Sequence, residues 1–495
     1  MTAGGDRADP VVRPDARVVV AGIGVAGYAT ADALVDLGAR VRVLDGRDDD
    51  RNRDRAAVLE ALGVDVRLGS GVADTLPDDV ELVVTSPGWR PTSPLLEQAV
   101  LRRIPVWGEV ELAWRLRPTR ADGTYAPWLA VTGTNGKTTT VQMLDAMLRA
   151  AGLRSAAVGN VGTPVLDAVR HPEPYDVLAV ELSSFQLHTT WSMSAQAAAV
   201  LNIAPDHLDW HGSFDAYRDA KARVYQRAQL ACVYPLGDAG VEQLVRAADV
   251  VEGCRAVGVT DGAPPVGSVG VVDGMLADRA FADDRQHQPA EMGSVDDIDP
   301  LAAHTLADAL AAAALARAHG VPPAAVGAGL RFFRLDAHRG ADVADQTAPG
   351  AGPAPVRWVD DSKATNPHAA LAALSAHPSV VWIAGGLAKG AAFDELVTGV
   401  RDRLRGAVLL GQDRTVIAEA LRRHAPEVRV IEVGDGETGP EVMDSAVAAA
   451  QGLAQPGDTV LLAPACASQD LFRDYAERGD AFAAAVRTHT RAMPG

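Results

Sequence analysis

A glycine-rich loop carries the clearest chemical signal in the chain. Residues 133–139 read Gly-Thr-Asn-Gly-Lys-Thr-Thr and lie between an apolar stretch at 129–132 and a helix expected over 140–150. In such a loop, backbone N–H groups approach phosphate oxygens, and the N-terminus of the following helix carries a partial positive charge. Lys137 can then reach the β- and γ-phosphates of a nucleotide, and the Thr138 hydroxyl can bind Mg²⁺. We predict a nucleoside triphosphate site formed by Gly133, Thr134, Asn135, Gly136, Lys137, Thr138 and Thr139.

Two polar residues follow later apolar segments. Glu181 comes directly after residues 176–180, and His207 follows the apolar stretch at 197–203. Side chains at the carboxyl ends of parallel strands form the ligand sites of α/β proteins. Glu181 is therefore a candidate Mg²⁺ contact, and a neutral imidazole at His207 can ligate a second metal ion.

A third group of charged residues lies much further along the chain. Arg339, Asp361 and Lys363 open the last third of the sequence. In a domain that closes over a nucleotide, the two cations would offset charge on the transferring γ-phosphoryl group. Ion pairing at the surface explains the same residues equally well.

A second glycine motif stands near the N-terminus. Residues 22–27 read Gly-Ile-Gly-Val-Ala-Gly, and Asp45 follows the next apolar stretch at 41–44. This is the full dinucleotide-binding fingerprint, so residue types alone suggest NAD here. An NAD-dependent dehydrogenase is one alternative for the function, although it leaves the loop at 133–139 unexplained.

The elements that must position these residues alternate between short β-branched runs and Ala/Leu-rich amphipathic stretches. This alternation indicates βαβ units and parallel sheets. It restarts after a polar connector at 117–127 and again after Phe333, whereas residues 262–299, rich in Gly, Pro and Asp, are expected to be a surface excursion. We predict an α/β protein with three domains: a Rossmann-like domain at 1–118, a central P-loop ATPase-like domain with a parallel sheet at 119–333, and a Rossmann-like domain at 334–495.

Composition narrows the classes of function and partner. The chain has 46 Lys and Arg against 64 Asp and Glu, a net charge of −18, which disfavours nucleic acid and anionic membranes as partners. Its three cysteines are too few for a disulfide framework, which fits a reducing compartment. No apolar run approaches the 18 residues of a membrane span, so we expect a cytoplasmic protein without membrane insertion.

The motifs together resemble the Mur ligase family over essentially the whole chain. They include SPG at 86–88, GTNGKTT at 133–139, DHLDWH at 206–211 and DSKATN at 361–366. The resemblance is closest to the member that adds D-glutamate to UDP-N-acetylmuramoyl-L-alanine. It implies ATP, two Mg²⁺ ions, an acyl-phosphate intermediate in peptidoglycan synthesis, and a monomer with these two small-molecule substrates.

The resemblance also implies roles for individual residues. Lys221, which alone reads as a solvent-facing lysine, would be carbamylated by CO₂ and hold the second Mg²⁺ with His207. The implied catalytic residues are Lys137, Glu181, His207, Lys221, Arg339, Asp361 and Lys363, of which Glu181, His207 and Lys221 bind metal with Thr138. The implied UDP-substrate residues are Val25, Ala26, Asp45, Gly46, Arg47, Gly88, Asn160 and His207, and those for D-glutamate are Thr365, Lys389, Ser468 and the backbone around Tyr475.

Some positions depart from the family pattern. Thr305 and Asp308 replace two amides expected near the adenine, Gly46 replaces a usual threonine, and residues 340–355 form an insertion expected to be flexible. Besides the dehydrogenase, two alternatives follow: a sister ligase that adds another amino acid, and an ATP-gated binding protein of cell-wall assembly.

Overall fold

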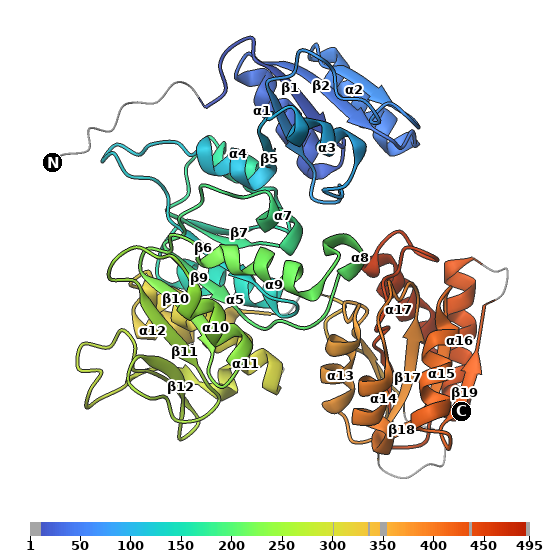
Figure 1. Ribbon diagram of the computed structural model, residues 1–495. Helices are drawn as coiled ribbons and strands as arrows, with labels where there is room; N and C mark the ends of the chain where they lie inside the picture. Colours follow the sequence, from blue (N-terminus) through green and yellow to red (C-terminus); the bar gives the residue numbers. More distant parts are fainter. Residues whose placement is uncertain (1–10, 300, 335–336, 347–353, 435–437, 492–495) are drawn as a thin grey trace. The chain divides into compact units, whose positions relative to one another are not determined.

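Three β-sheets organise the chain (Figure 1). The computed structural model describes residues 11–299, 301–334, 337–346, 354–434 and 438–491. One compact unit holds residues 1–203 and 215–333 with two of the sheets, and the other holds residues 204–214 and 334–495 with the third. The α/β architecture predicted from the sequence is confirmed, and the described residues contain no helix long and apolar enough to cross a membrane.

The first sheet has five parallel strands. They are β1 (Arg17–Ala21), β2 (Arg40–Asp45), β3 (Asp65–Leu68), β4 (Leu82–Thr85) and β5 (Val106–Gly108), with helices α1 (Val25–Asp36), α2 (Asp50–Ala61) and α3 (Pro94–Leu101). Their order is β3-β2-β1-β4-β5, so the order reverses between β1 and β4. Val18 and Val20 of β1 enter one apolar core while Val19 and Ala21 enter another, because successive side chains of a strand point to opposite faces. Both faces of this sheet are therefore covered, as a parallel sheet requires.

The second sheet has nine strands in the order β14-β13-β12-β11-β10-β9-β6-β8-β7. The strands are β6 (Trp128–Thr132), β7 (Ser155–Gly159), β8 (Val177–Glu181), β9 (Ala197–Val200), β10 (Ala231–Pro235), β11 (Arg255–Val259), β12 (Ser268–Val272), β13 (Met275–Asp278) and β14 (Ala290–Ser294). The helices of this part are α4 (Glu109–Arg115), α5 (Lys137–Ala150), α6 (Val165–Val169), α7 (Ser184–His188), α9 (Phe214–Ala222), α10 (Ala239–Ala247), α11 (Ala303–Ala318) and α12 (Pro323–Phe332), with 3₁₀ turns at Arg223–Tyr225 and Val295–Asp297. Seven strands, from β7 to β12, run parallel, and α5 packs against the sheet and against α11 and α12.

The expectation of a surface excursion at 262–299 is wrong. Strands β12, β13 and β14 lie in this segment and extend the sheet as antiparallel pairs. Asp273 and Gly274 connect β12 to β13 with positive φ angles of 47° and 75°. Both angles suit a two-residue hairpin turn, for which Asp-Gly is a preferred sequence. The Asp-Gly pair between apolar residues was thus a hairpin signal inside a segment whose composition suggested a loop.

The third sheet has the order β15-β16-β20-β17-β18-β19. Its strands are β15 (Ala341–Gln346), β16 (Val356–Asp360), β17 (Val380–Gly385), β18 (Leu404–Leu410), β19 (Arg429–Glu432) and β20 (Thr459–Leu462); the helices of this unit are α8 (Leu208–His211), α13 (Pro367–Ser375), α14 (Asp394–Val400), α15 (Arg414–His424), α16 (Gly439–Leu453) and α17 (Tyr475–Arg491), with a 3₁₀ turn at Arg401–Arg403. All neighbours are parallel except β15, which pairs antiparallel with β16. The insertion expected to be flexible therefore begins as an edge strand, and its residues 347–353 lie outside the described residues.

Candidate active site

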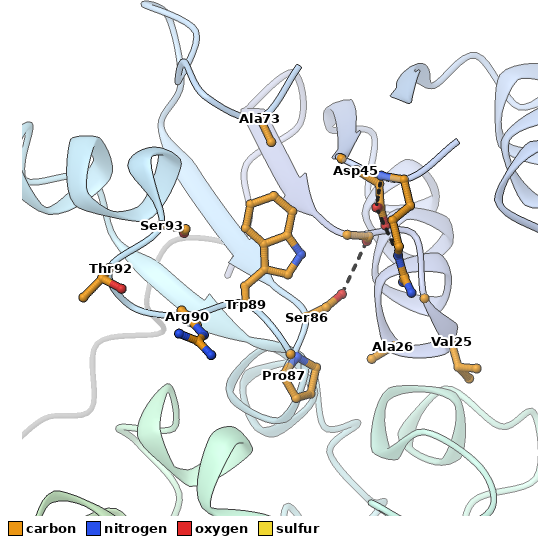
Figure 2. Close-up of a pocket in the computed structure, with 15 residues that line it drawn as sticks. Val25, Ala26, Asp45, Ala73, Ser86, Pro87, Trp89, Arg90, Thr92 and Ser93 are labelled. Atoms are coloured by element: carbon orange, nitrogen blue, oxygen red, sulfur yellow. Dashed lines mark hydrogen bonds and ion pairs between the residues drawn. The ribbon is translucent and has the colours of Figure 1, made fainter. Parts of the chain in front are cut away.

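A cavity of about 730 Å³ opens at the carboxyl ends of β1, β2 and β4 (Figure 2). This is the point where the strand order reverses, and ligands of open α/β sheets bind at such points. Six of the eight residues predicted to contact the UDP substrate line this one cavity, although they come from three separate segments of the chain: Val25, Ala26, Asp45, Gly46, Arg47 and Gly88. Nothing lies within 4 Å of a Cβ added at Gly46 or Gly88, so their backbones face open space.

Asp45 holds the shape of this pocket. Its carboxylate accepts hydrogen bonds from the backbone N–H of Ile23, at 3.0 Å, and from that of Arg47, at 2.9 Å. Asp45 is 5% exposed, so these bonds tie the turn after β1 to the loop after β2. A Cβ at Gly27 would lie 1.9 Å from the carbonyl oxygen of Gly22, which is the close helix–strand packing that the third glycine of the fingerprint permits.

Trp89 is a pocket residue that the sequence analysis missed. Figure 2 shows its indole in the middle of the pocket, with Asp45 on one side and Thr92 on the other. A Cβ at Gly22, whose φ is +97°, would lie 2.7 Å from the indole nitrogen of Trp89. The indole therefore fits in this position only because Gly22 has no side chain. Trp89 directly follows the SPG motif at 86–88, and this position next to a motif was the signal from which a role in the pocket could have been predicted.

The phosphate loop joins β6 to α5, as predicted. Gly136 has a φ of +83° at the start of the helix, and a Cβ there would lie 2.2 Å from a carboxylate oxygen of Asp308. Lys137 donates hydrogen bonds to the carbonyl oxygens of Gly133, at 3.0 Å, and Thr134, at 2.8 Å. The ammonium group is therefore folded over the loop itself.

Residues from other parts of the first unit hold the loop in place. The Asn202 side chain, in the segment after β9, accepts from the backbone N–H of Asn135 and donates to its carbonyl oxygen. The hydroxyls of Thr134 and Tyr217 share a hydrogen bond of 2.8 Å. Neither Asn202 nor Tyr217 was recognised from the sequence, because their partners lie 67 and 83 residues away.

Glu181 stands beside the start of the phosphate loop. It ends β8 and is paired in register with Val131 of β6, two residues before Gly133. One carboxylate oxygen accepts a hydrogen bond from the Asn160 side chain at 2.8 Å. The other oxygen, Oε2, is buried without a hydrogen-bond partner among the described residues. A buried carboxylate oxygen without a donor is a suitable cation contact, because an unpaired buried charge is otherwise costly.

Lys221 is buried rather than solvent-facing. It is 2% exposed, and its amine donates to the carbonyl oxygen of Gly133 at 2.6 Å. It also lies 3.4 Å from the hydroxyl of Thr132 and 4.8 Å from the ring centroid of Tyr217. The amine therefore lies at the base of the phosphate loop.

His207 belongs to the second unit, through the segment 204–214. It has a left-handed backbone, with a φ of +52°, at the start of α8, and its Nε2 lies 3.5 Å from a carboxylate oxygen of Asp206. Within the described ranges, no three His, Cys, Asp or Glu side chains are close enough to hold a metal ion. The predicted metal ligands Thr138, Glu181 and Lys221 lie in the first unit, so the set is divided between the two units.

The second unit holds the three predicted charged residues Arg339, Asp361 and Lys363. Lys363 lies over the ring of Tyr475, with its Nζ 3.8 Å from the ring centroid. Burial raises the pKa of Asp361 from 3.8 to about 7, with the Arg339 guanidinium opposing the rise. Arg339 lies just before β15, whose first residue pairs with Asp360, so Arg339, Asp361 and Lys363 lie at the carboxyl end of β16.

The remaining predicted residues of this unit also lie at carboxyl ends of strands. Thr365 follows β16, the exposed Lys389 follows β17, and the buried Ser468 follows β20. Sequence analysis missed His338, whose Nδ1 lies 2.7 Å from a carboxylate oxygen of Asp360.

Comparison with known proteins identifies relatives along the whole chain. Three family models match: "Mur ligase MurD-like, N-terminal domain" at residues 16–108, "Mur ligase middle domain" at 131–259 and "Mur ligase, glutamate ligase domain" at 348–466. A UDP-N-acetylmuramoylalanine–D-glutamate ligase of Streptomyces coelicolor is 60% identical over 95% of this chain and 97% of its own length. The protein of the same name from Leifsonia xyli is 50% identical over 96% of this chain and 92% of its own length.

Solved structures share the fold at low sequence identity. A UDP-N-acetylmuramate-alanine ligase from Thermotoga maritima superposes with a TM-score of 0.55 and 19% identity, covering 96% of this chain and 99% of its own. A MurF ligase from the same organism, solved with ADP, has a TM-score of 0.52 and 15% identity, covering 91% and 96% of the two chains. These proteins have similar folds throughout their length.

Proposed function

This chain belongs to the Mur ligase family, and from that premise we propose that it is an ATP-dependent ligase joining D-glutamate to UDP-N-acetylmuramoyl-L-alanine in peptidoglycan precursor synthesis. The 60% identity to a protein of that name, over almost the full length of both chains, supports the choice of amino acid and acceptor. The structural observation that carries the proposal is the phosphate loop at the start of α5, with Glu181 beside it on the neighbouring strand. A dehydrogenase would have no use for this loop.

The reaction has two steps. The alanyl carboxylate attacks the γ-phosphorus of ATP, the bond to the β,γ-bridging oxygen breaks, and the products are an acyl-phosphate and ADP. The amine of D-glutamate then attacks the acyl carbon, the amide bond forms, and inorganic phosphate leaves with the proton passing to solvent. Activation is required because a free carboxylate does not form an amide readily in water.

Lys137 and the start of α5 stabilise the charge of the phosphates. In this structure the lysine amine donates to two carbonyl oxygens of its own loop, and phosphate oxygens would replace those acceptors. The N-terminus of α5 lies at the same loop, and a helix N-terminus presents backbone N–H groups and a partial positive charge to phosphate oxygens. The lysine amine and the helix N-terminus stabilise the transition state most strongly, because negative charge then spreads over the transferring phosphoryl group.

Thr138 and Glu181 would hold a Mg²⁺ ion. The donor set fits, because Oε2 of Glu181 is buried without a partner and hydroxyl and carboxylate oxygens are the ligands that Mg²⁺ prefers. When bound, Mg²⁺ neutralises phosphate charge and aligns the γ-phosphoryl group. We assign His207 and a carbamylated Lys221 to a second ion.

Carbamylation of Lys221 would convert its amine into a carboxylate. Burial favours the neutral form of an amine, which is the form that adds to CO₂ with loss of one proton. In the present geometry the amine donates to the Gly133 carbonyl, so the modification would exchange this contact for metal coordination. Intact-protein mass in bicarbonate should increase by one CO₂ in the wild type but not in Lys221→Arg.

The other proposed roles follow the grouping of residues described above. The cavity at β1, β2 and β4 would bind the UDP part of the substrate, with Asn160 and His207 facing its muramoyl-alanine part. Thr365, Lys389, Ser468 and the backbone of Tyr475 would bind D-glutamate, while Arg339, Asp361 and Lys363 would act near the γ-phosphoryl group. We propose a cytoplasmic monomer, because the cytoplasm supplies ATP and all proposed groups lie on one chain.

One coupled assay of phosphate release tests the proposal. Purified protein with ATP, Mg²⁺ and UDP-N-acetylmuramoyl-L-alanine should release phosphate at full rate only when D-glutamate is added. A panel containing L-glutamate, L-alanine, L-lysine and diaminopimelate separates this ligase from sister ligases. Full turnover with one of these amino acids and none with D-glutamate would contradict the assigned specificity. A rate of phosphate release that does not depend on either substrate would contradict the assignment as a ligase.

A further inference from the structure

Arg478 is a fully buried arginine on α17 that neither the predicted site nor the proposed reaction uses. Its side chain is 0% exposed. Its Nε donates to the hydroxyl of Ser362 at 3.0 Å, and one terminal nitrogen donates to the carbonyl oxygen of the same residue at 2.9 Å. The other terminal nitrogen donates to the carbonyl oxygens of Cys466, at 3.1 Å, and Gly385, at 3.5 Å.

These acceptors belong to the carboxyl-end regions of three strands that are adjacent in the sheet, in the order β16-β20-β17. Ser362 follows β16, Cys466 follows β20, and Gly385 is the last residue of β17. We call the segments 361–366, 385–390 and 463–468 the three loops. Each carries one residue proposed to bind D-glutamate, namely Thr365, Lys389 or Ser468. One guanidinium group therefore fixes the spacing of all three.

Ser362 links Arg478 to Tyr475, whose ring contacts Lys363. Its hydroxyl donates to the carbonyl oxygen of Tyr475 at 2.7 Å while it accepts from Arg478. The Tyr475 ring lies against the ammonium group of Lys363 at 3.8 Å. Displacing Arg478 would thus also release the backbone beneath Tyr475.

Stability alone gives a poor reason for an arginine at this position. Burial lowers the pKa of the Arg478 guanidinium to about 10, with the charges of Cys466, Asp470 and Asp360 opposing the fall, and its hydrogen bonds are to carbonyl and hydroxyl oxygens rather than to a carboxylate. A buried cation without a paired anion costs free energy, and a well-packed apolar side chain is often at least as stabilising. A planar group with five fixed donors, by contrast, is suited to holding several carbonyl oxygens at set distances.

We propose that Arg478 is a positioning residue for the amino-acid pocket, holding the three loops at the spacing that D-glutamate requires. The proposal rests on the proposed function, since it takes D-glutamate as the ligand of these loops. Binding sites lose affinity when their donors shift by about 1 Å, so the effect should fall on the KM for one substrate.

Arg478→Lys tests the proposal because it keeps the positive charge and removes the planar guanidinium group with its fixed donors. We expect the KM for D-glutamate to rise about tenfold or more, consistent with lost hydrogen bonds to a charged group, while kcat and the KM values for ATP and the UDP substrate change by less than about threefold. Arg487→Lys is the matched control: it makes the same change at an exposed position of the same helix and should leave all four constants unchanged. Equal loss in all constants, or an unchanged KM for D-glutamate, would overturn the proposal.

A measurement without substrates separates this proposal from the proposed function. Hydrogen–deuterium exchange of Arg478→Lys and of the milder Ser362→Ala should be faster in the three loops than in wild type, with β18 unchanged. If the wild type ligated another amino acid instead of D-glutamate, the faster exchange would still support the positioning role. Wild-type exchange rates in all three loops of both variants would refute it.

Discussion

The side-chain amide of Asn160 donates a hydrogen bond to Oε1 of Glu181 over 2.8 Å, whereas Oε2 of the same carboxylate is buried without a partner among the described residues. Glu181→Gln keeps an acceptor for Asn160 and replaces Oε2 with an NH₂ group that cannot bind a cation. We expect the Mg²⁺ concentration for half-maximal turnover to rise about tenfold or more, because a carboxylate ligand is lost. Titrating phosphate release with Mg²⁺ measures this. Glu252→Gln, an exposed change in the same unit, is the control, and overlapping titrations of the two variants would exclude the metal role.

Lys137 should contribute mainly to the transition state. Lys137→Ala removes the ammonium group that lies within 3.0 Å of two loop carbonyls, and we expect kcat to fall by about 10²–10³, as for loss of one preorganised donor. Single-turnover rates at saturating ATP measure the effect. Arg149→Ala, in the last turn of the same helix, should retain wild-type turnover, because Arg149 is an exposed side chain whose partners are the Asp145 carboxylate and the Ser155 carbonyl oxygen, both outside the phosphate loop. A nearly active Lys137→Ala would contradict the assignment.

Glu109 should make stability depend on pH. It is 3% exposed and accepts a hydrogen bond from the backbone N–H of Leu166, and burial raises its pKa from 4.5 to about 7. Because the folded state binds the proton more tightly than the unfolded state, the stability contributed by this group is fully present below pH 4.5 and is lost as pH rises to about 7.

Glu109→Gln removes that titration. The variant should match wild type near pH 4.5 and exceed it above pH 7, by a difference on the order of 3 kcal/mol at most. Thermal unfolding of both proteins between pH 4.5 and 8 gives the comparison, with the difference between them isolating Glu109 from other titrating groups. A difference that stays constant across this range would show that Glu109 is ionised in the folded protein throughout.

Trp89 should report ligand binding in the cavity at β1, β2 and β4. Because its indole stands in the middle of the pocket, UDP should change tryptophan emission, and Trp89→Phe should abolish most of that change while keeping an aromatic ring (Figure 2). NAD⁺ should give no saturable change in either protein. Trp191→Phe, at a 51% exposed tryptophan, should keep the wild-type response to UDP. A saturable response to NAD⁺ alone would favour the dehydrogenase alternative.

The sequence by itself determined the fold class, the family and the phosphate loop. These signals are local: the strand, the glycines, Lys137, Thr138 and the helix lie within about twenty consecutive residues, so neighbouring residues specify the geometry. Apolar runs bounded by turns likewise indicated most strands of the three sheets, because a buried parallel strand must be apolar on both faces.

Tertiary structure alone decided which distant residues support the site. Arg478 and Ser362 are 116 positions apart, and nothing in the local sequence distinguishes a buried arginine on an amphipathic helix from an exposed one. Burial of Lys221 beneath the loop and the open oxygen of Glu181 depend in the same way on how strands and helices pack. Strand pairing also overrode composition in β12–β14 and β15, because hydrogen bonds to a neighbouring strand stabilise segments whose own residues favour loops.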